Sequence, residues 1–564
     1  MSTYRKFAYI MFLMVYGAFS SLLSGQESTA ADWNWTESTI TVSPARDGHH
    51  LFLDKFGDRL YFRGGDDEAQ TIEVYSWSRE HLNTVQASLK FGDKALIFDR
   101  LLESGTGLIG IFKWVDRDNS QLEVYSASLR EDAFTNPSLL LTHNYLKVVG
   151  AFKNAYPVTK THIFTSSTCD DYFVSAEDLS FHLYTNRLAP IGYSNKVNRE
   201  IEGRYFALLD ANFELIREWT IPDSPEFKIS EFALSSEGVI YFKGSKEMKL
   251  FEKNEELAGK KGPNYYLYFG IVEEEGYTTI PLGLAKGYQA TNFAITLEEG
   301  SSRFMLTGFY TDGMTSGNMT GLFVARGEGG EMEEMTASEL PAGFSENEVI
   351  VHKSKLDGWV HVIKGEKIVD YRSYSSGLRL KSYAQRANGE TSLVFEFDNT
   401  YAYTRYGSYR DSGGTIRHVN RGTNLANNTG SLFFVTLNQE DELVDINLYH
   451  KYYYSSSILA VPSMIWQDDE FTYACFMNLR SRKEIKTLSG DHNFGELLEY
   501  GKWDRSGELV DWRILQSGIK NYSDVPLPQA RQGQEVLFES FNLHHPLGNK
   551  IEPYSFRLAQ KELR

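Results

Sequence analysis

One hairpin-like segment recurs along this chain, and it constrains the fold more than any other feature. Residues 438–448 and 504–514 align without a gap, and four consecutive residues, Glu-Leu-Val-Asp, are identical at an offset of 66 residues. In residues 210–217 a turn Asp is again followed four residues later by a Glu. Residues 367–372 repeat the second half of the segment. In each long copy an apolar stretch precedes a turn that opens with Asp or Asn. Because these side chains bond their own backbone in turns, the pattern predicts a repeated β-hairpin.

The rest of the chain after residue 45 has the same character. Its apolar stretches are short, alternate with polar residues and end at Gly, Asp, Asn or Ser, which is typical of half-buried strands. The chain has 46 Gly and only 14 Pro. Glycine allows many tight turns, and a low proline content leaves most backbone N–H groups able to form sheet hydrogen bonds. Only residues 141–156 have a pattern that permits a helix, and Val148, Val149 and Gly150 weaken it. The sequence therefore predicts an all-β protein.

The repeat unit contains four strands where it is clearest. Residues 291–297, 304–310, 321–325 and 332–337 have strand patterns, and looser copies recur at a pitch of about 60 residues. Radial repetition protects strand edges, so we predict a single β-propeller of seven or eight four-stranded blades with long loops over residues 46–564. The equivalent Leu443 and Leu509 should then both face the packing between blades. Another multi-sheet all-β architecture is the alternative, although the irregular pitch disfavours a solenoid.

The strand over residues 304–310, the Gly-rich polar loop after it and the segment 321–324 resemble uncharacterised exported bacterial β-propeller-type proteins. The resemblance covers one unit well and the others loosely. It implies a propeller fold and export, and it supplies no catalytic residue. The named propeller signatures, such as a Trp-Asp blade ending or the sialidase box, are missing from the chain.

The N-terminus has the order of a secretory signal peptide. Arg5 and Lys6 precede an apolar stretch over residues 7–23, and the chain turns polar at Ser24. We predict a signal peptide over residues 1–25, a linker over 26–45 and no membrane span in the mature chain; a single anchoring span is the alternative. The protein should be secreted, periplasmic or on the cell surface. Without Arg5 and Lys6, 55 basic residues face 75 acidic ones, and this net charge of −20 disfavours nucleic acid as a partner.

One region is basic and aromatic against this acidic background. Tyr residues at 401, 403, 406 and 409 precede a stretch to residue 430 that we predict to be a polar loop, and four Arg against one Asp give a local charge of +3. Aromatic rings can stack on the apolar face of a sugar, and arginine guanidinium groups can bind carboxylates through two hydrogen bonds. The pattern therefore predicts an anionic glycan site. The candidate ligand-binding residues are Tyr406, Tyr409, Arg410, Arg417, His418 and Arg421. The alternative is a strand pair and a loop without a ligand.

The other chemically suggestive motifs are incomplete. Residues 410–414 differ by one residue from the segment around the nucleophile of trypsin-like proteases, but no base partner is evident for Ser412. The His pairs at 49–50 and 544–545, the Asp pairs at 66–67, 170–171 and 468–469, and the loop after Asp116 are interpreted as turns. We therefore predict no metal site and no cofactor. Cys169 and Cys475 are 306 residues apart, and either they pair or Cys475 is a buried thiol.

These observations leave two classes of function. The first is an exported, non-catalytic binding module for a glycan or another envelope protein. The second is an extracellular carbohydrate-active enzyme, either a glycoside hydrolase or a polysaccharide lyase. Propellers host both, so the side chains of the site must decide. Converging carboxylates with raised pKa values would favour the enzyme, whereas a site lined by Thr, Ser and Gly would favour binding.

Overall fold

A computed structural model describes side chains in residues 52–140, 231–246, 266–341, 378–398, 429–453, 463–478, 497–515 and 530–537, with short gaps inside these ranges. Elsewhere it gives the bounds and pairing of strands. The described residues form strands and turns and contain no helix. Residues 141–156, the one segment whose pattern permitted a helix, include the end of one strand and two further short strands.

The strands form antiparallel sheets, and we number the main sheets along the chain. Sheet 1 contains β2 (Phe52–Phe56), β3 (Arg59–Gly65), β4 (Gln70–Ser76) and β5 (His81–Gln86). Sheet 2 contains β8 (Ile97–Ser104), β9 (Gly107–Asp116), β10 (Gln121–Arg130), β11 (Ala133–Phe134) and β12 (Ser138–Asn144). Sheet 3 contains β15 (Thr159–Thr165), β16 (Tyr172–Thr185), β17 (Asn195–Leu209) and β18 (Leu215–Pro222). Sheet 4 contains β19 (Phe227–Leu234), β20 (Ile240–Glu247), β21 (Tyr265–Glu273) and β22 (Gly276–Ile280).

The second half of the chain continues the series. Sheet 5 contains β23 (Gln289–Leu297), β24 (Arg303–Thr311), β25 (Gly321–Glu328), β26 (Glu331–Met332) and β27 (Thr336–Glu339). Sheet 6 contains β30 (Leu378–Gln385), β31 (Thr391–Arg410), β32 (Ile416–Leu437), β33 (Leu443–Tyr449) and β34 (Tyr453–Ser455). Sheet 7 contains β35 (Met464–Gln467), β36 (Thr472–Arg480), β37 (Gly495–Trp503) and β38 (Leu509–Ile519). Sheet 8 contains β39 (Val525–Gln532), β40 (Glu535–Phe541), β41 (Tyr554–Arg557) and β1 (Asn34–Thr36).

Three short hairpins lie between the main sheets. They are formed by β6 (Lys90–Phe91) with β7 (Lys94–Ala95), β13 (Lys147–Val149) with β14 (Ala155–Pro157), and β28 (Val351–Lys355) with β29 (Val360–Glu366). In sheet 5, the stretch 332–337 that we predicted as one strand is divided between β26 and β27, which both pair with β25.

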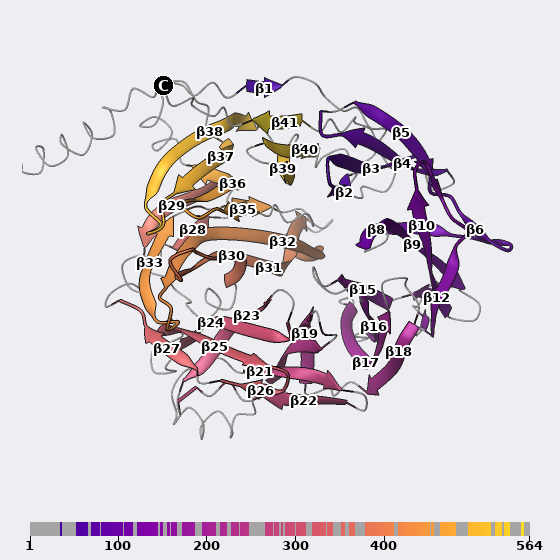
Figure 1. Cartoon of the computed structure of the whole chain (residues 1–564), viewed down its shortest axis with the longest axis horizontal. Coiled ribbons are helices and arrows are strands. Elements are labelled where there is room, and N and C mark those ends of the chain that lie inside the picture. Colours follow the sequence, from indigo (N-terminus) through magenta and orange to yellow (C-terminus); the bar gives the residue numbers. More distant parts are fainter. Residues whose placement is uncertain are drawn as a thin grey trace, which may run out of the picture.

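The main sheets are arranged around a ring, as Figure 1 shows. The first strands of neighbouring sheets contact one another: β15, β19, β23, β30 and β35 in succession, and β39, β2 and β8 in succession. The ring is closed because β39 of the last sheet contacts β2 of the first, and because β1 pairs with β41. Sheets of about four antiparallel strands, arranged around a ring in which the first and last sheets contact each other, define a β-propeller, so the predicted all-β propeller is confirmed. β1 lies inside the segment 26–45 that we predicted as a linker.

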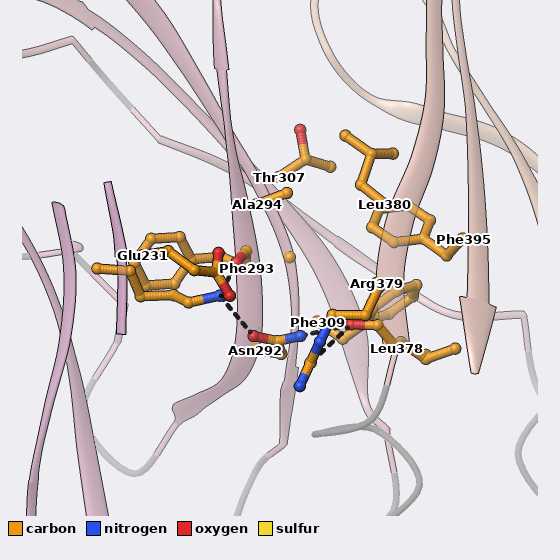
Figure 2. A pocket seen from close by; sticks show the side chains of 12 residues that line it. Glu231, Asn292, Phe293, Ala294, Thr307, Phe309, Leu378, Arg379, Leu380 and Phe395 are labelled. Carbon is orange, nitrogen blue, oxygen red and sulfur yellow. Dashed lines mark hydrogen bonds and ion pairs between the residues drawn. The ribbon is translucent and has the colours of Figure 1, made fainter. Parts of the chain in front are cut away.

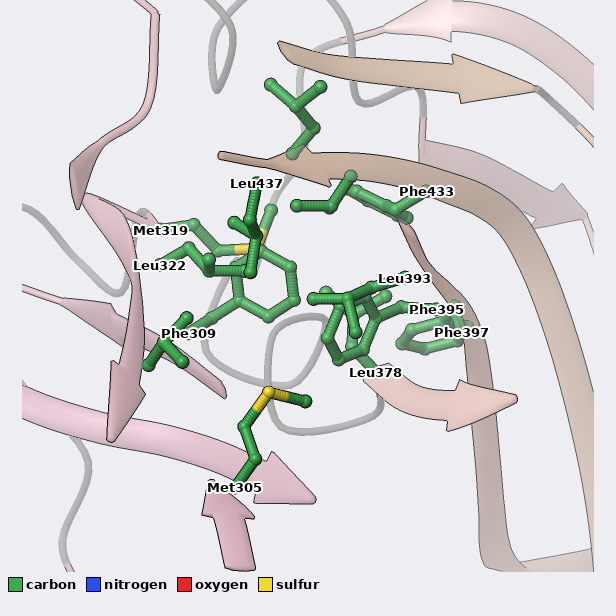
Figure 3. Packing of buried hydrophobic residues seen from close by; sticks show 13 residues of the cluster. Met305, Phe309, Met319, Leu322, Leu378, Leu393, Phe395, Phe397, Phe433 and Leu437 are labelled. Atoms are coloured by element: carbon green, nitrogen blue, oxygen red, sulfur yellow. The ribbon is translucent and has the colours of Figure 1, made fainter. Parts of the chain in front are cut away.

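The hydrophobic core lies between neighbouring sheets. The cluster drawn in Figure 3 joins Met305, Phe309 and Leu322 of sheet 5 to Leu393 and Phe433 of sheet 6. Another cluster joins sheets 4 and 5, and another joins sheets 6 and 7 around Trp503. The closure is packed in the same way, since residues of sheet 1 share a cluster with residues of sheet 8. Face-to-face burial between blades therefore holds the ring together.

The repeated hairpin is the connection between the third and fourth strands of its sheet. In sheet 6, the Asn438 Oδ1 accepts hydrogen bonds from the backbone N–H groups of Glu440 and Glu442 at 3.1 and 2.8 Å. In sheet 7, the Asp504 Oδ1 accepts from Ser506 and Glu508 at 3.0 and 2.9 Å. The copy at residue 210 lies between β17 and β18, at the same place in sheet 3. The predicted hairpin repeat is thus confirmed.

The two equivalent leucines differ in burial, which corrects one prediction. Leu443 is half-buried and packs against the cluster between sheets 5 and 6, and its backbone N–H donates to the Ser338 Oγ of sheet 5 at 3.0 Å. Leu509 begins the outermost strand of sheet 7 with 46% of its surface exposed. The prediction that both leucines face the packing between blades is wrong for Leu509. Burial on an outermost strand depends on how far the neighbouring sheet extends, and an aligned repeat does not determine that.

Candidate functional site

The first strands carry a recurring irregularity. In six main sheets the register between the first and second strands shifts by one residue. The extra residues of these β-bulges are Leu53, Asp99, Ser230, Thr291, Lys381 and Gln529. A bulge breaks the ladder and redirects neighbouring side chains, and bulges are enriched beside functional sites. Sequence reasoning missed them, although an apolar residue followed by polar ones near the start of a strand, as in Phe98-Asp99-Arg100, is a signal that could have found one.

At or near two of these bulges, a cation from the preceding sheet binds a backbone carbonyl group. The Arg63 Nη2 of sheet 1 donates to the backbone carbonyl of Asp99 in sheet 2 at 2.6 Å. The Lys243 Nζ of sheet 4 donates to the backbone carbonyl of Phe293 in sheet 5 at 2.8 Å. These side chains give hydrogen-bond partners to carbonyl groups of the first strands and also tie adjacent blades together.

A pocket of about 160 Å³ lies where the first strands of sheets 4, 5 and 6 meet, and we call it the wall pocket. Figure 2 shows Asn292, Leu378 and Arg379 on one side of it and Thr307 and Ala294 on the opposite side. Its lining is Glu231, Lys243, Asn292, Phe293, Ala294, Thr307, Gly308, Phe309, Leu378, Arg379, Leu380 and Phe395. The pocket therefore combines charged, amide, hydroxyl and aromatic groups from three blades.

Lys243 organises the charged side of the wall pocket. Its side chain is 5% exposed, and its Nζ lies 2.6 Å from the Glu231 Oε1. The same Nζ donates to the Asn292 Oδ1 at 3.1 Å and to the Phe293 carbonyl. Burial lowers the pKa of Lys243, and the nearby Arg379 lowers it further, while Glu231 opposes both effects. Three acceptors match the three protons of an ammonium, so Lys243 holds the site together.

The backbone beside Asn292 is held closely against β24. The Asn292 Nδ2 donates to the Leu378 carbonyl of the next sheet. A Cβ on Gly308 would clash with the Asn292 carbonyl oxygen and lie 2.6 Å from the Phe293 Cβ, so only glycine fits opposite Phe293. Next to it, the Thr307 side chain is fully buried and its hydroxyl has no hydrogen-bond partner.

The carboxylates near the inner strands are engaged in ion pairs. Asp99 lies 2.9 Å from the Lys113 Nζ and 2.7 Å from the Arg100 Nε, and these cations lower its pKa although burial acts in the opposite direction. Glu396 is fully buried, and Lys451 and Lys381 likewise hold its pKa below the ordinary value. Burial raises the pKa of Asp54. Among the described carboxylates, we find no pair with raised pKa values.

The six residues predicted to bind a ligand lie on one long hairpin. Tyr406, Tyr409 and Arg410 belong to β31, and Arg417, His418 and Arg421 belong to β32. Residues 416–430 of the stretch that we predicted as a polar loop therefore belong to a strand, which corrects that expectation. The register places Tyr409 opposite Arg417 and Ser408 opposite His418. The side chains of all six lie outside the described residues, so their role stays a prediction.

The remaining motifs fall into two groups. Asp468 is a turn residue, since its Oδ1 accepts from the backbone N–H groups of Glu470 and Phe471. Cys475 is a free buried thiol whose pKa is raised by burial. The side chains of Cys169, Ser412, both His pairs and the Asp pairs at 66–67 and 170–171 lie outside the described residues. Within the described part, no three potential metal ligands gather, and no helix is long and apolar enough to cross a membrane.

Comparison with solved structures finds matches of low sequence identity. A puromycin-hydrolyzing peptidase of Mycobacterium tuberculosis shares 12% identity at a TM-score of 0.33, over 90% of this chain and 61% of that one. The β-propeller domain of the Trilobed protease from Pyrococcus furiosus shares 10% at 0.31, over 86% and 97%. A polysaccharide lyase shares 8% at 0.26, over 93% and 94%. This chain spans about three fifths of the first peptidase. No protein-family model and no curated protein matches it.

Proposed function

We propose that this protein is an exported, non-catalytic β-propeller that binds a glycan or another envelope protein. The observation that supports this best is the wall pocket, a concave site of about 160 Å³ built by three blades. Concave sites with an apolar lining and a few convergent polar groups are the usual places for ligands. Lys243 fixes Glu231 and Asn292 in this pocket, so its polar groups are held in position before a ligand arrives.

The ionisation of the inner carboxylates supports binding over hydrolysis. A glycosidase needs one carboxylic acid whose pKa is raised, together with a second carboxylate at a defined distance. Asp99 and Glu396 have lowered pKa values because lysine and arginine side chains neutralise them. Such groups stay ionised near neutral pH and stabilise the blades instead of transferring protons.

A glycan array combined with parallel turnover assays tests this proposal. The full chain should retain at least one class of glycan, or capture an envelope protein, without releasing any product. Formation of new reducing ends would identify a glycoside hydrolase, and formation of unsaturated sugars would identify a polysaccharide lyase. Either product would overturn the non-catalytic assignment.

The β31–β32 hairpin is the proposed contact for an anionic glycan. Its register brings Tyr409 opposite Arg417, so an aromatic ring and a guanidinium come from adjacent backbone positions. The double variant R417A/R421A should lose binding to a sulfated or uronic glycan with its melting temperature nearly unchanged. The half-buried Arg303, which pairs with Glu298 and Glu333 away from this hairpin, provides the control R303A. An unchanged affinity of the double variant at low and moderate salt would remove this hairpin as the contact.

The proposal also includes the number of blades and the removal of a signal peptide during export. Each main sheet corresponds to one blade, which makes eight, and the first strands and the pairing of β1 with β41 support this number. An experimental structure that merges two sheets into one blade would contradict it. Removal of residues 1–25 during export is tested by N-terminal sequencing of protein recovered outside the cytoplasm.

A further inference from the structure

We propose that Lys243 and Asn292, with Glu231 as the proton acceptor, react with each other to form an isopeptide bond that links sheets 4 and 5. This inference is independent of the proposed binding function, because the bond forms once within each chain and involves no ligand. Three observations carry it: the contact between the two side chains, the carboxylate beside them and the apolar enclosure of the pair.

The lysine and the asparagine are in contact across the interface between two blades. Lys243 lies on β20 of sheet 4 and Asn292 on β23 of sheet 5, and the Lys243 Nζ donates to the Asn292 Oδ1 at 3.1 Å. This hydrogen bond reaches Asn292 as a dashed line in Figure 2. The carbon that the amine attacks, Cγ, is bonded to this oxygen, so the amine needs only a small shift to reach it.

The amide of Asn292 is held in the orientation that the reaction requires. Its Nδ2 donates to the Leu378 carbonyl of sheet 6, so its oxygen is turned toward Lys243 and its nitrogen away from it. Both polar atoms of the amide are anchored in this way, and Asn292 is only 9% exposed. Reacting groups that are held side by side gain a large advantage over the same groups in free molecules.

Glu231 provides a proton acceptor for the lysine. Its Oε1 lies 2.6 Å from the Lys243 Nζ, and its side chain is 45% exposed. An ammonium must lose a proton before its nitrogen can attack a carbon, and a carboxylate in direct contact can take that proton. Glu231 then returns the proton to the nitrogen that leaves Asn292.

The surroundings of the pair favour a neutral amine. Lys243 and Phe293 are 4% and 2% exposed, and the Lys243 Nζ lies 5.4 Å from the centre of the Phe293 ring. Burial lowers the pKa of Lys243, which makes deprotonation easier, although Glu231 opposes this effect. The wall pocket, of about 160 Å³, adjoins both reacting side chains and provides space for the released ammonia.

The reaction is balanced without an oxidant or a cofactor. The bond between Nζ and Cγ forms, the Cγ–Nδ2 bond of Asn292 breaks, and the lysine ammonium and the amide become a secondary amide and one ammonium ion. The positive charge of Lys243 therefore leaves the protein. Glu231 keeps its charge, and its partly exposed carboxylate is then solvated by water. The chain gains a covalent link between positions that are 49 residues apart.

Mass spectrometry of the full chain tests the inference. The natural protein and the Lys243→Met variant are denatured after purification, and each intact mass is compared with the mass calculated from its own sequence. Relative to the variant, the natural protein should lack the mass of one ammonia molecule. Proteolysis should then give a branched peptide in which residues 243 and 292 are joined. Equal mass differences in both proteins, or fragmentation that shows both side chains unmodified, would overturn the proposal.

Two further variants separate the reaction from folding. Glu231→Gln keeps the side-chain shape at a partly exposed position, so it provides the comparison if Lys243→Met does not fold. At equal times after synthesis, its fraction of cross-linked chains should be lower by about tenfold or more, because the proton acceptor is lost. Asn83→Ala removes an amide of sheet 1 that donates to the Glu131 carbonyl, and it should leave the cross-linked fraction unchanged. A cross-link that forms equally fast in E231Q and in the natural protein would overturn the proposal.

Discussion

Lys451 and Glu396 form an ion pair in which neither side chain is exposed, with the Lys451 Nζ 2.5 Å from the Glu396 Oε1. Glu396 also accepts a hydrogen bond from the Ser463 hydroxyl at 2.5 Å, and the Lys381 Nζ lies 3.4 Å from its other oxygen. Ser463 immediately precedes sheet 7, so this buried carboxylate connects sheets 6 and 7. Removing one partner of a buried pair leaves an uncompensated charge in the core.

We expect Lys451→Met to destabilise the protein by about 3–5 kcal/mol, as for other buried pairs that lose one partner. Chemical denaturation followed by tryptophan fluorescence measures the change. The double variant K451M/E396L should recover most of the loss, because it also removes the carboxylate that has lost its buried partner. A single variant as stable as the natural protein would show that the pair contributes no stability.

The same pair should make stability depend on pH. The pKa of Glu396 in the folded protein lies below its ordinary value of 4.5, so the unfolded chain takes up a proton first as the pH falls. The stabilisation is fully present above pH 4.5 and is lost as the pH falls through the folded pKa. The difference in unfolding free energy between the natural protein and K451M should therefore shrink on acidification below pH 4.5. A difference that stays constant from neutral pH to pH 3 would contradict this assignment.

Thr307→Val should stabilise the unliganded protein by about 1 kcal/mol, because it removes a buried hydroxyl without a hydrogen-bond partner and keeps the side-chain shape. Thr291→Val is the matched control. The Thr291 hydroxyl is also buried, but it donates to the Phe309 carbonyl at 3.0 Å, so its loss should destabilise by about 1 kcal/mol. Thermal melts of the two variants should shift in opposite directions, and a lower melting temperature for T307V would show that the Thr307 hydroxyl is satisfied in the unliganded protein.

Gly308→Ala should destabilise the protein by more than about 2 kcal/mol, since the added methyl group meets the backbone of the neighbouring strand, which cannot yield without repacking. Gly330→Ala is the control, because the nearest atom to a Cβ there is the Ile271 Cδ1 at 3.8 Å. Denaturant midpoints of the two variants should differ clearly. Equal midpoints would show that the first strand of sheet 5 tolerates a wider separation.

The sequence by itself determined the strands and the repeated hairpin, because both depend on neighbours along the chain. Alternation with a period of two predicts a strand, and the turns at Asn438 and Asp504 are stabilised by bonds to their own next residues. Each turn also contains one residue in the left-handed conformation, Asp441 with a φ of 60° and Gly507 with a φ of 82°. Gly and Asp adopt this conformation more readily than most residues, so this feature too depends on residue type. Radial repetition of such hairpins was then enough to predict a propeller.

Only the tertiary structure decided where the bulges, the wall pocket and the exposed outer positions lie. Lys243 and Phe293 are 50 residues apart, and Asn292 and Leu378 are 86 residues apart, so they meet only when neighbouring blades are placed around the ring. The same placement buries part of Leu443 and leaves Leu509 exposed although the two repeats align. Contacts between blades depend on the length and twist of whole sheets, which no local pattern of residues encodes.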